Sequence, residues 1–107
     1  MQRRKYLRIR VEFRSTFSGE QIEGQGKVVD LSLGGCRIES DSHVATGTAL
    51  ELRLYVLDID SPLRIDLARV RWARGRAFGV AFIRLPDEDR ARLRQLLCRA
   101  IGGRFRT

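Results

Sequence analysis

The sequence predicts a mainly β domain, with about six short antiparallel strands followed by one C-terminal helix. Apolar residues alternate with polar ones over most of the chain from Ile9 to Phe82, as expected of half-buried strands. After Pro86 the apolar residues recur instead every three or four positions, which is the period of an amphipathic helix. With 107 residues, the chain is long enough for one modest core and too short for two.

The first strand is expected to begin at Ile9, where apolar residues start to alternate with Arg10, Glu12 and Arg14. In the last strand, alternation leaves Gly79 at a place where no side chain fits. Glycine-rich and polar segments between the apolar runs indicate turns. Strand-like segments lie at 9–17, 27–30, 36–40, 49–57, 63–72 and 78–82.

Within the segment over 63–72, the apolar positions shift by one residue between Leu67 and Ala68. A slip of one residue inside a strand is what a β-bulge produces, and bulges bend strands into closed sheets. The pattern therefore predicts a bulge at this point. It also places Trp72 in phase with Val70, on the face of the strand that continues from Ala68.

The C-terminal helix is expected over 87–101. Acidic residues crowd its first turn and Arg99 lies in its last, both favourable to the helix dipole. Gly102 and Gly103 are expected to end it. Its apolar stripe most simply packs on the sheet, and the alternative is an exposed interface; the stripe consists of Leu93, Leu96, Leu97, Ala100 and Ile101.

Positive charge is clustered in this chain. The formal net charge is +8, from 21 Lys and Arg against 13 Asp and Glu. Basic residues gather in 1–14, where Glu12 is the only acid, and in 69–76, where there is none. Clustering points to an anionic partner, which is a nucleotide, a nucleic acid or an anionic membrane surface. A solvated basic surface is the alternative.

The residues give no indication of an enzyme. We find no Ser/His/Asp set, paired carboxylates, metal cluster or phosphate loop, so catalysis, a metal and a cofactor are not expected. His43 is the only histidine and is interpreted as a surface-loop residue. Cys36 and Cys98 are too few and too far apart for a disulfide framework and are expected as reduced thiols.

No apolar run approaches the roughly 18–20 residues of a membrane span, and the N-terminus lacks the apolar core of a signal peptide. The sequence therefore predicts a cytoplasmic protein without a membrane span.

Two polar motifs stand out. The first packs bidentate hydrogen-bonding forks into a short arm, which suits phosphates and the acceptor edge of guanine. The second puts a carboxylate and a hydroxyl on a glycine-bearing turn, where a ligand can approach the backbone closely. The motifs are RRxxxR, with Arg3, Arg4 and Arg8, and DxSxxG, with Asp30, Ser32 and Gly35.

In this order, with strand-like sequence between and after them, the two motifs resemble the PilZ domain, the bacterial receptor module for the second messenger cyclic di-GMP. The resemblance covers roughly residues 3–101. It implies a six-stranded antiparallel β-barrel with a C-terminal α-helix. The expected single domain consists of a flexible basic arm at 1–8, a barrel at 9–86 that carries DxSxxG, and the helix at 87–101.

By this resemblance, Arg4 and Arg8 grip phosphate and the O6/N7 edge of a guanine, and Arg3 adds a further donor. In the family, an arginine directly before RxxxR accompanies a stacked ligand dimer, so Arg3 favours the binding of two molecules. The arm is expected to be mobile without ligand and to fold over it when bound. The alternative for this segment is a disordered basic tail.

The resemblance gives Asp30 the role of acceptor for the N1–H and N2 amine of guanine. Ser32 donates or accepts locally, and Gly35 permits the turn and the close approach. The alternative is an Asx-type turn that holds a β connection together, and both roles can hold at once.

There are four secondary candidates, and two of them, Trp72 and Gly79, follow from the same resemblance. Trp72 stacks a base at the mouth of the barrel or, alternatively, lies in the core. Gly79 matches the glycine that follows the aromatic strand residue in the family. Arg71 and Arg74 flank Trp72 and could reach a phosphate.

The function implied is a receptor that binds cyclic di-GMP and passes the signal to an unidentified partner protein or attached domain. The alternative is a basic β-barrel that binds single-stranded nucleic acid. Its weakness is that the phenylalanines sit at in-phase core positions rather than on an exposed stacking platform. Specific nucleic-acid binding is therefore not expected.

Overall fold

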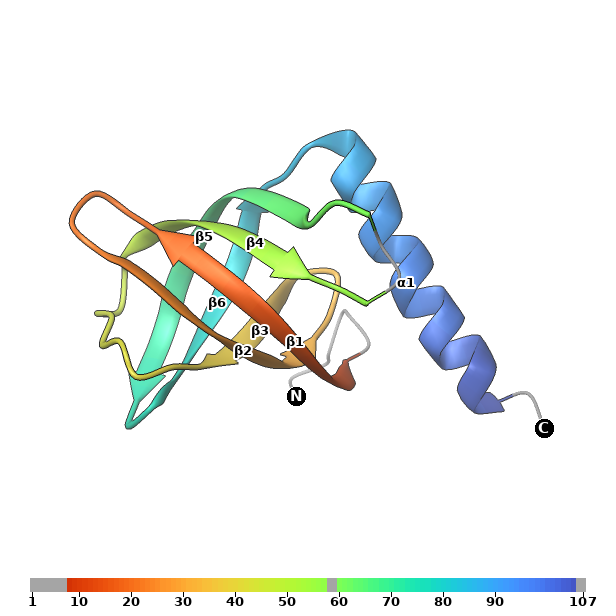
Figure 1. Cartoon of the computed structure of the whole chain (residues 1–107), viewed down its shortest axis with the longest axis horizontal. Coiled ribbons are helices and arrows are strands. Elements are labelled where there is room, and N and C mark those ends of the chain that lie inside the picture. The colour runs from red at the N-terminus through yellow and green to blue at the C-terminus, as the bar shows by residue number, and fades with distance from the viewer. Residues whose placement is uncertain (1–7, 58–59, 106–107) are drawn as a thin grey trace, which may run out of the picture.

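The computed structural model describes residues 8–57 and 60–105, with side chains described as far as Ala100. Six strands form a closed antiparallel barrel in the order β1-β2-β3-β6-β5-β4, and one helix follows (Figure 1). The predicted fold class is confirmed. The elements are β1 (Ile9–Ser18), β2 (Glu23–Leu31), β3 (Gly35–Glu39), β4 (Ala49–Tyr55), β5 (Leu63–Arg74), β6 (Ala77–Arg84) and α1 (Asp87–Phe105).

The interior of the barrel is filled with apolar side chains that come from the predicted alternation. Phe17 and Phe78 are almost fully buried and meet edge to face, with ring centroids 5.3 Å apart. Phe13 and Phe82 are partly buried and pack against the same core. These four aromatic rings therefore stabilise the barrel and do not form an exposed stacking surface.

Two register shifts bend β5 against β6, and they correct the sequence prediction in part. The shift between Leu67 and Ala68 is the predicted bulge, which is confirmed. A second shift follows Val70, so that Val70 pairs with Val80 but Trp72 pairs with Gly79. Because this shift adds a residue to β5, Trp72 leaves the face of Val70 and is 43% exposed. The expectation that Trp72 lies in phase with Val70 was wrong.

The helix α1 packs against the barrel through contacts with β5 and β1 (Figure 1). Leu93 and Leu97 are buried, as expected of its apolar stripe, whereas Ala100 is exposed. The predicted end at Gly102 and Gly103 was wrong, since α1 continues to Phe105. Glycine weakens a helix interior by about 1 kcal/mol without forcing an end there.

Asp89 ties the beginning of α1 to the barrel. Its side chain is buried and its Oδ2 accepts a hydrogen bond of 2.8 Å from the backbone N–H of Arg64. Arg92 lies 3.4 Å from the same oxygen and also donates to the carbonyl of Ser61. One carboxylate thus connects the helix with the beginning of β5 and the segment before it.

Within residues 8–57 and 60–105, no helix is long and apolar enough to cross a membrane.

Candidate functional site

The last residue of the RRxxxR motif, Arg8, and the first residue of the DxSxxG motif, Asp30, meet on the outside of the barrel. The pairing of β1 with β2 places Arg10 opposite Asp30. Arg8 precedes β1 directly, and its Nη1 lies 3.5 Å from Oδ2 of Asp30. The side chains of Arg8 and Asp30 are 56% and 25% exposed, so a ligand can reach both. Arg3 and Arg4 lie outside the described residues.

Asp30 faces outward because β2 changes register at Val29. Val28 and Leu31 are both fully buried, which strict alternation forbids for residues at odd spacing. The pairing of β2 with β3 shifts between Val28 and Asp30, and the pairing with β1 shifts at the same level. The irregularity leaves Leu31 in the core and turns the carboxylate of Asp30 toward the outer surface.

Ser32 holds the connection between β2 and β3. Its backbone N–H donates to the carbonyl of Gly35 at 2.9 Å, and its Oγ accepts from the backbone N–H of Gly34 at 3.1 Å. The residue is 7% exposed, so the hydroxyl faces the turn. This geometry agrees with the local hydrogen-bonding role predicted for Ser32.

Gly35 begins β3 and lies opposite Ala81 on β6. A Cβ atom at Gly35 would stand 2.2 Å from the carbonyl oxygen of Val80, so any side chain would push the two strands apart. Gly35 therefore serves the packing of β3 on β6, and the close approach of a ligand expected at this glycine stays a prediction.

A row of directly opposed residues crosses the outer surface from β1 to β5. Opposed residues in antiparallel strands point to the same face of the sheet. Arg37, on β3, lies opposite both Asp30 and Gly79 and therefore connects the DxSxxG motif with Trp72. We call this set the transverse row; its members are Arg10, Asp30, Arg37, Gly79 and Trp72.

Trp72 rests on Gly79. A Cβ atom at Gly79 would lie 2.1 Å from Nε1 and 2.5 Å from Cε2 of the indole, so the missing side chain makes room for the ring. This explains why no side chain fits at Gly79, as predicted. Trp72 presents an exposed aromatic surface on the outer face, and its alternative placement in the core was wrong.

The sequence did not single out Arg10 or Arg37 as candidates. Their signal is their place opposite Asp30, which depends on strand pairing and is invisible in the linear pattern. The secondary candidates Arg71 and Arg74 are both exposed on β5. Arg74 pairs with Ala77, beyond the transverse row toward the hairpin turn.

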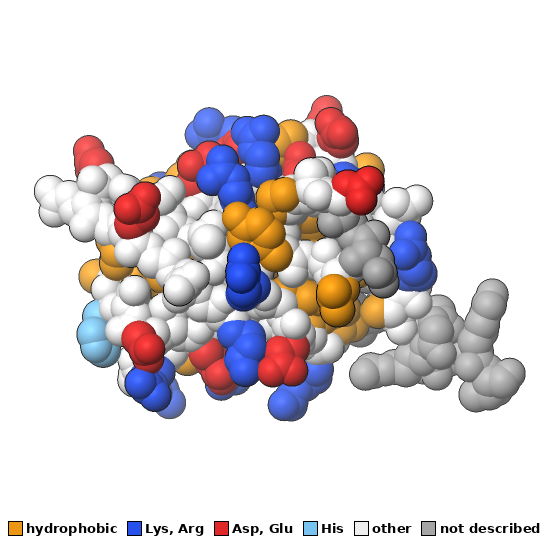
Figure 2. Space-filling model, in the orientation of Figure 1, with side chains coloured by type: hydrophobic (Ala, Val, Ile, Leu, Met, Phe, Trp, Pro, Cys, Tyr) orange, Lys and Arg blue, Asp and Glu red, His pale blue; other side chains and the backbone are white. Residues whose placement is uncertain are grey.

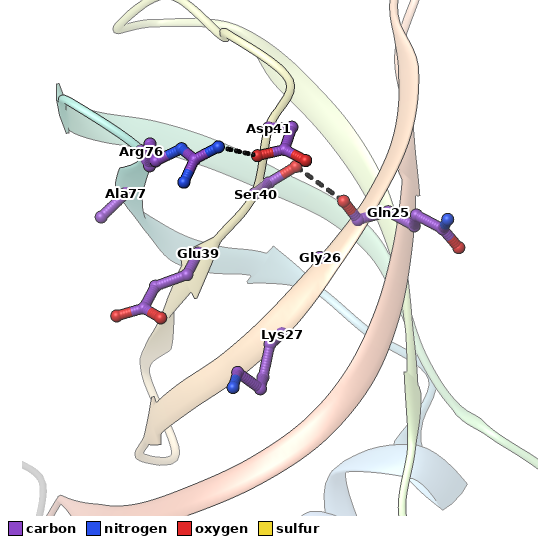
Figure 3. A pocket seen from close by; sticks show the side chains of 8 residues that line it. All are labelled: Gln25, Gly26, Lys27, Glu39, Ser40, Asp41, Arg76 and Ala77. Atoms are coloured by element: carbon purple, nitrogen blue, oxygen red, sulfur yellow. Dashed lines mark hydrogen bonds and ion pairs between the residues drawn. The ribbon is translucent and has the colours of Figure 1, made fainter.

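Beside the transverse row lies a hollow of about 590 Å³ at the ends of β2, β3 and β6 (Figure 3). Arg76 and Asp41 form an ion pair of 2.7 Å across one side of it. Lys27 and Glu39 face each other in the register of β2 and β3. The lining is made up of Gln25, Gly26, Lys27, Glu39, Ser40, Asp41, Arg76 and Ala77.

Several basic side chains on this outer surface are paired with acidic ones. Arg37 Nη2 lies 3.6 Å from Glu39 Oε2, and Lys27 Nζ donates to Glu12 Oε2 at 2.9 Å. The hydrogen bond lowers the pKa of Glu12 below its ordinary value of 4.5 and raises the pKa of Lys27 above 10.5. Figure 2 shows acidic and basic side chains interspersed over the face in view.

The cysteines and the histidine lie apart from this surface chemistry. Cys36 is buried, and its burial raises the pKa of the thiol, whereas Cys98 is exposed on α1. His43 is exposed in the loop after β3. Among residues 8–57 and 60–105, no group of three or more His, Cys, Asp or Glu side chains gathers as metal ligands would.

Comparison with solved structures finds chains of similar fold. The Bacillus subtilis inhibitor of motility (MotI/DgrA) is 20% identical, with a TM-score of 0.82 over 99% of this chain and 55% of that chain. The PilZ domain of CeSA from a cellulose-synthesizing bacterium is 20% identical, with a TM-score of 0.67 over 84% of this chain and 93% of that one. YcgR of Escherichia coli, in complex with c-di-GMP, is 17% identical, with a TM-score of 0.75 over 92% of this chain and 46% of that one.

These likenesses concern the fold, and the chain spans about half the length of the first and third of these proteins. No curated protein matches the sequence. The family model of the PilZ domain matches residues 2–99. Because this match covers all of the barrel and most of α1, the chain belongs to the PilZ domain family.

Proposed function

We propose that this protein is a receptor for cyclic di-GMP. The observation that carries the proposal is the meeting of Arg8 and Asp30 on the outer face of a PilZ barrel. Cyclic di-GMP presents two phosphates and two guanines, so its receptor needs positive charge for the former and shaped donors and acceptors for the latter. The exposed guanidinium of Arg8 beside the half-buried carboxylate of Asp30 supplies both.

In this proposal the two motifs divide the ligand between them. Asp30 accepts hydrogen bonds from the N1–H and N2 amine of a guanine, which an arginine or lysine cannot do. Arg8, with Arg4 and Arg3 from the arm, donates to phosphate oxygens and to the O6/N7 edge. Ligand binding then replaces part of the Arg8–Asp30 contact with contacts to the nucleotide.

The other end of the transverse row supports the proposal. The exposed indole of Trp72 offers a surface on which a base can stack, at the far side of Arg37 from Asp30. Arg71 and Arg74 add positive charge near this end. The arm folds over the bound ligand, and this ordering passes the signal to a partner protein or an attached domain.

Titration calorimetry with cyclic di-GMP at ~0.15 M salt tests the proposal. GTP, cyclic di-AMP and random single-stranded DNA are titrated separately for comparison. We expect selective binding of cyclic di-GMP, with two molecules for each chain. Fluorescence of Trp72, the only tryptophan, should change during the same titration. Equal affinity for single-stranded DNA would favour the nucleic-acid alternative, because phosphate neutralisation alone does not select a nucleotide.

A further inference from the structure

Arg37 lies outside both sequence motifs but at the centre of the transverse row. Across β2 it faces Asp30, and across β6 it faces Gly79, on which Trp72 rests. Its side chain is 48% exposed. A nucleotide that spans from the carboxylate of Asp30 to the indole of Trp72 must therefore pass over Arg37.

The guanidinium of Arg37 is turned toward Glu39, which follows it on the same strand and the same face. Arg37 Nη2 and Glu39 Oε2 are 3.6 Å apart, and Glu39 is 46% exposed. Glu39 lines the hollow beside the row (Figure 3). The Arg37–Glu39 ion pair therefore runs along β3, whereas Asp30 lies opposite Arg37 on the neighbouring strand β2. Asp30 has a different partner, Arg8.

Glu39 has a second cation within reach. Lys27 lies directly opposite it on β2. The pKa of Lys27 is raised mainly by its hydrogen bond with Glu12 and further by the charge of Glu39. Glu39 therefore keeps a positive neighbour if Arg37 turns away, which lowers the cost of breaking the Arg37–Glu39 pair.

We infer that Arg37 is an additional ligand-binding arginine and that Glu39 is a positioning residue that competes with the ligand for it. This inference rests on the proposed function, and it identifies a residue of the same site that lowers the affinity for the ligand. An exposed ion pair at this distance contributes little, whereas a phosphate or a guanine edge accepts charge-assisted bidentate hydrogen bonds from arginine. Exchange of Glu39 for the ligand as the partner of Arg37 is therefore favourable. The free energy needed to break the Arg37–Glu39 pair is subtracted from the binding free energy of the ligand.

A double-mutant cycle tests both parts, with the parent, R37A, E39Q and R37A/E39Q titrated with cyclic di-GMP. We expect R37A to raise Kd at least about tenfold, because charge-assisted bonds to the ligand are lost. E39Q should lower Kd about two- to fivefold, the equivalent of an exposed ion pair. In the R37A background, E39Q should have no effect, since the residue for which Glu39 competes is gone.

The chain offers a matched control on β5. Arg64 and Asp66 have the same spacing along a strand, an N–O distance of 3.1 Å and comparable exposure, and they lie at the opposite end of β5 from Trp72. R64A and D66N should leave Kd unchanged. A gain in D66N equal to that in E39Q would show that any lost carboxylate strengthens binding of an anion, and it would overturn the role of Glu39.

Other outcomes separate the two proposals. An unchanged Kd in R37A, with a parent that binds, overturns the role of Arg37 and leaves the proposed function intact. A gain from E39Q that persists without Arg37 means that Glu39 repels the ligand directly, which overturns the competition. A parent that does not bind cyclic di-GMP overturns the proposed function and this inference together.

Discussion

Two aspartate–arginine pairs in this protein have the same chemistry and different surroundings. Asp30 and Arg8 lie 3.5 Å apart on the outer face, with side chains 25% and 56% exposed. Asp89 and Arg92 lie 3.4 Å apart near the beginning of α1 itself, with side chains 9% and 24% exposed. Asp89 also accepts a backbone hydrogen bond from Arg64, and Arg92 also donates to a backbone carbonyl.

The comparison teaches which pair is structural and which can bind a ligand. The Asp89 pair is enclosed and joins two elements, so its loss leaves buried groups without partners. The Asp30 pair is open to solvent, where an ion pair adds little to stability and each partner can exchange the other for a ligand. The same two residue types therefore serve the fold at the beginning of α1 and, in the proposed function, ligand binding on the outer face.

The largest expected effect is that of Asp89→Ala on stability. The substitution removes the acceptor for the Arg64 backbone N–H and the partner of Arg92, with an expected cost of about 2–3 kcal/mol. Thermal unfolding should show a Tm lower by about 10 °C or more, and urea unfolding should show a lower midpoint concentration. Asp89→Asn, which keeps one acceptor oxygen, should lose less. If Asp89→Ala unfolds like the parent, the pair is not structural and the comparison fails.

Next in size are the expected losses of affinity in Arg8→Ala and Asp30→Ala. Each removes charge-assisted hydrogen bonds to the ligand worth roughly 1.5–3 kcal/mol, so Kd for cyclic di-GMP should rise about ten- to a hundredfold. Their Tm should stay close to that of the parent, because Arg8 is exposed and its ion pair with the half-buried Asp30 reaches solvent. Calorimetry and thermal unfolding of the same samples measure the two effects. Normal binding by Arg8→Ala would contradict the assignment of the site.

A smaller effect is expected for Trp72→Ala. Base stacking on an aromatic ring is worth about 1–3 kcal/mol. The affinity for cyclic di-GMP should therefore fall, by no more than in Arg8→Ala. Loss of stability should stay well below the ~3–5 kcal/mol typical of a buried tryptophan, because the side chain is 43% exposed. Urea unfolding and ligand titration separate the two. A large loss of stability with unchanged affinity would make Trp72 a packing residue.

The smallest effect is expected for Glu12→Gln, which breaks an ion pair on the outer face. Its hydrogen bond with Lys27 lowers the pKa of Glu12 below 4.5, so the folded state favours the charged carboxylate. The resulting stability is present above the ordinary pKa and is lost as the pH falls through the lowered value. Urea midpoints of parent and variant should differ slightly near about pH 7, and the difference should shrink as the pH falls below 4.5. A difference that is constant with pH would exclude this ion pair as its cause.

The sequence by itself determined the fold class and two of the candidate binding residues. Alternation places Leu50, Leu52 and Leu54 in the core, and the slip at Leu67 predicts a bulge that the structure contains. These patterns are readable because burial of one face imposes a period of two on the chain. The two motifs likewise name Arg8 and Asp30 as candidates without any knowledge of strand pairing.

Only the tertiary structure decided which of these side chains share a surface. The register shifts after Val28 and Val70 turn Asp30 and Trp72 outward, and strand pairing sets Arg37 between them. A bulge moves every following residue to the other face, but nothing in the composition around Val29 or Arg71 marks one. The inserted residue is defined by its lack of a partner on the neighbouring strand, and that partner is far away in the sequence.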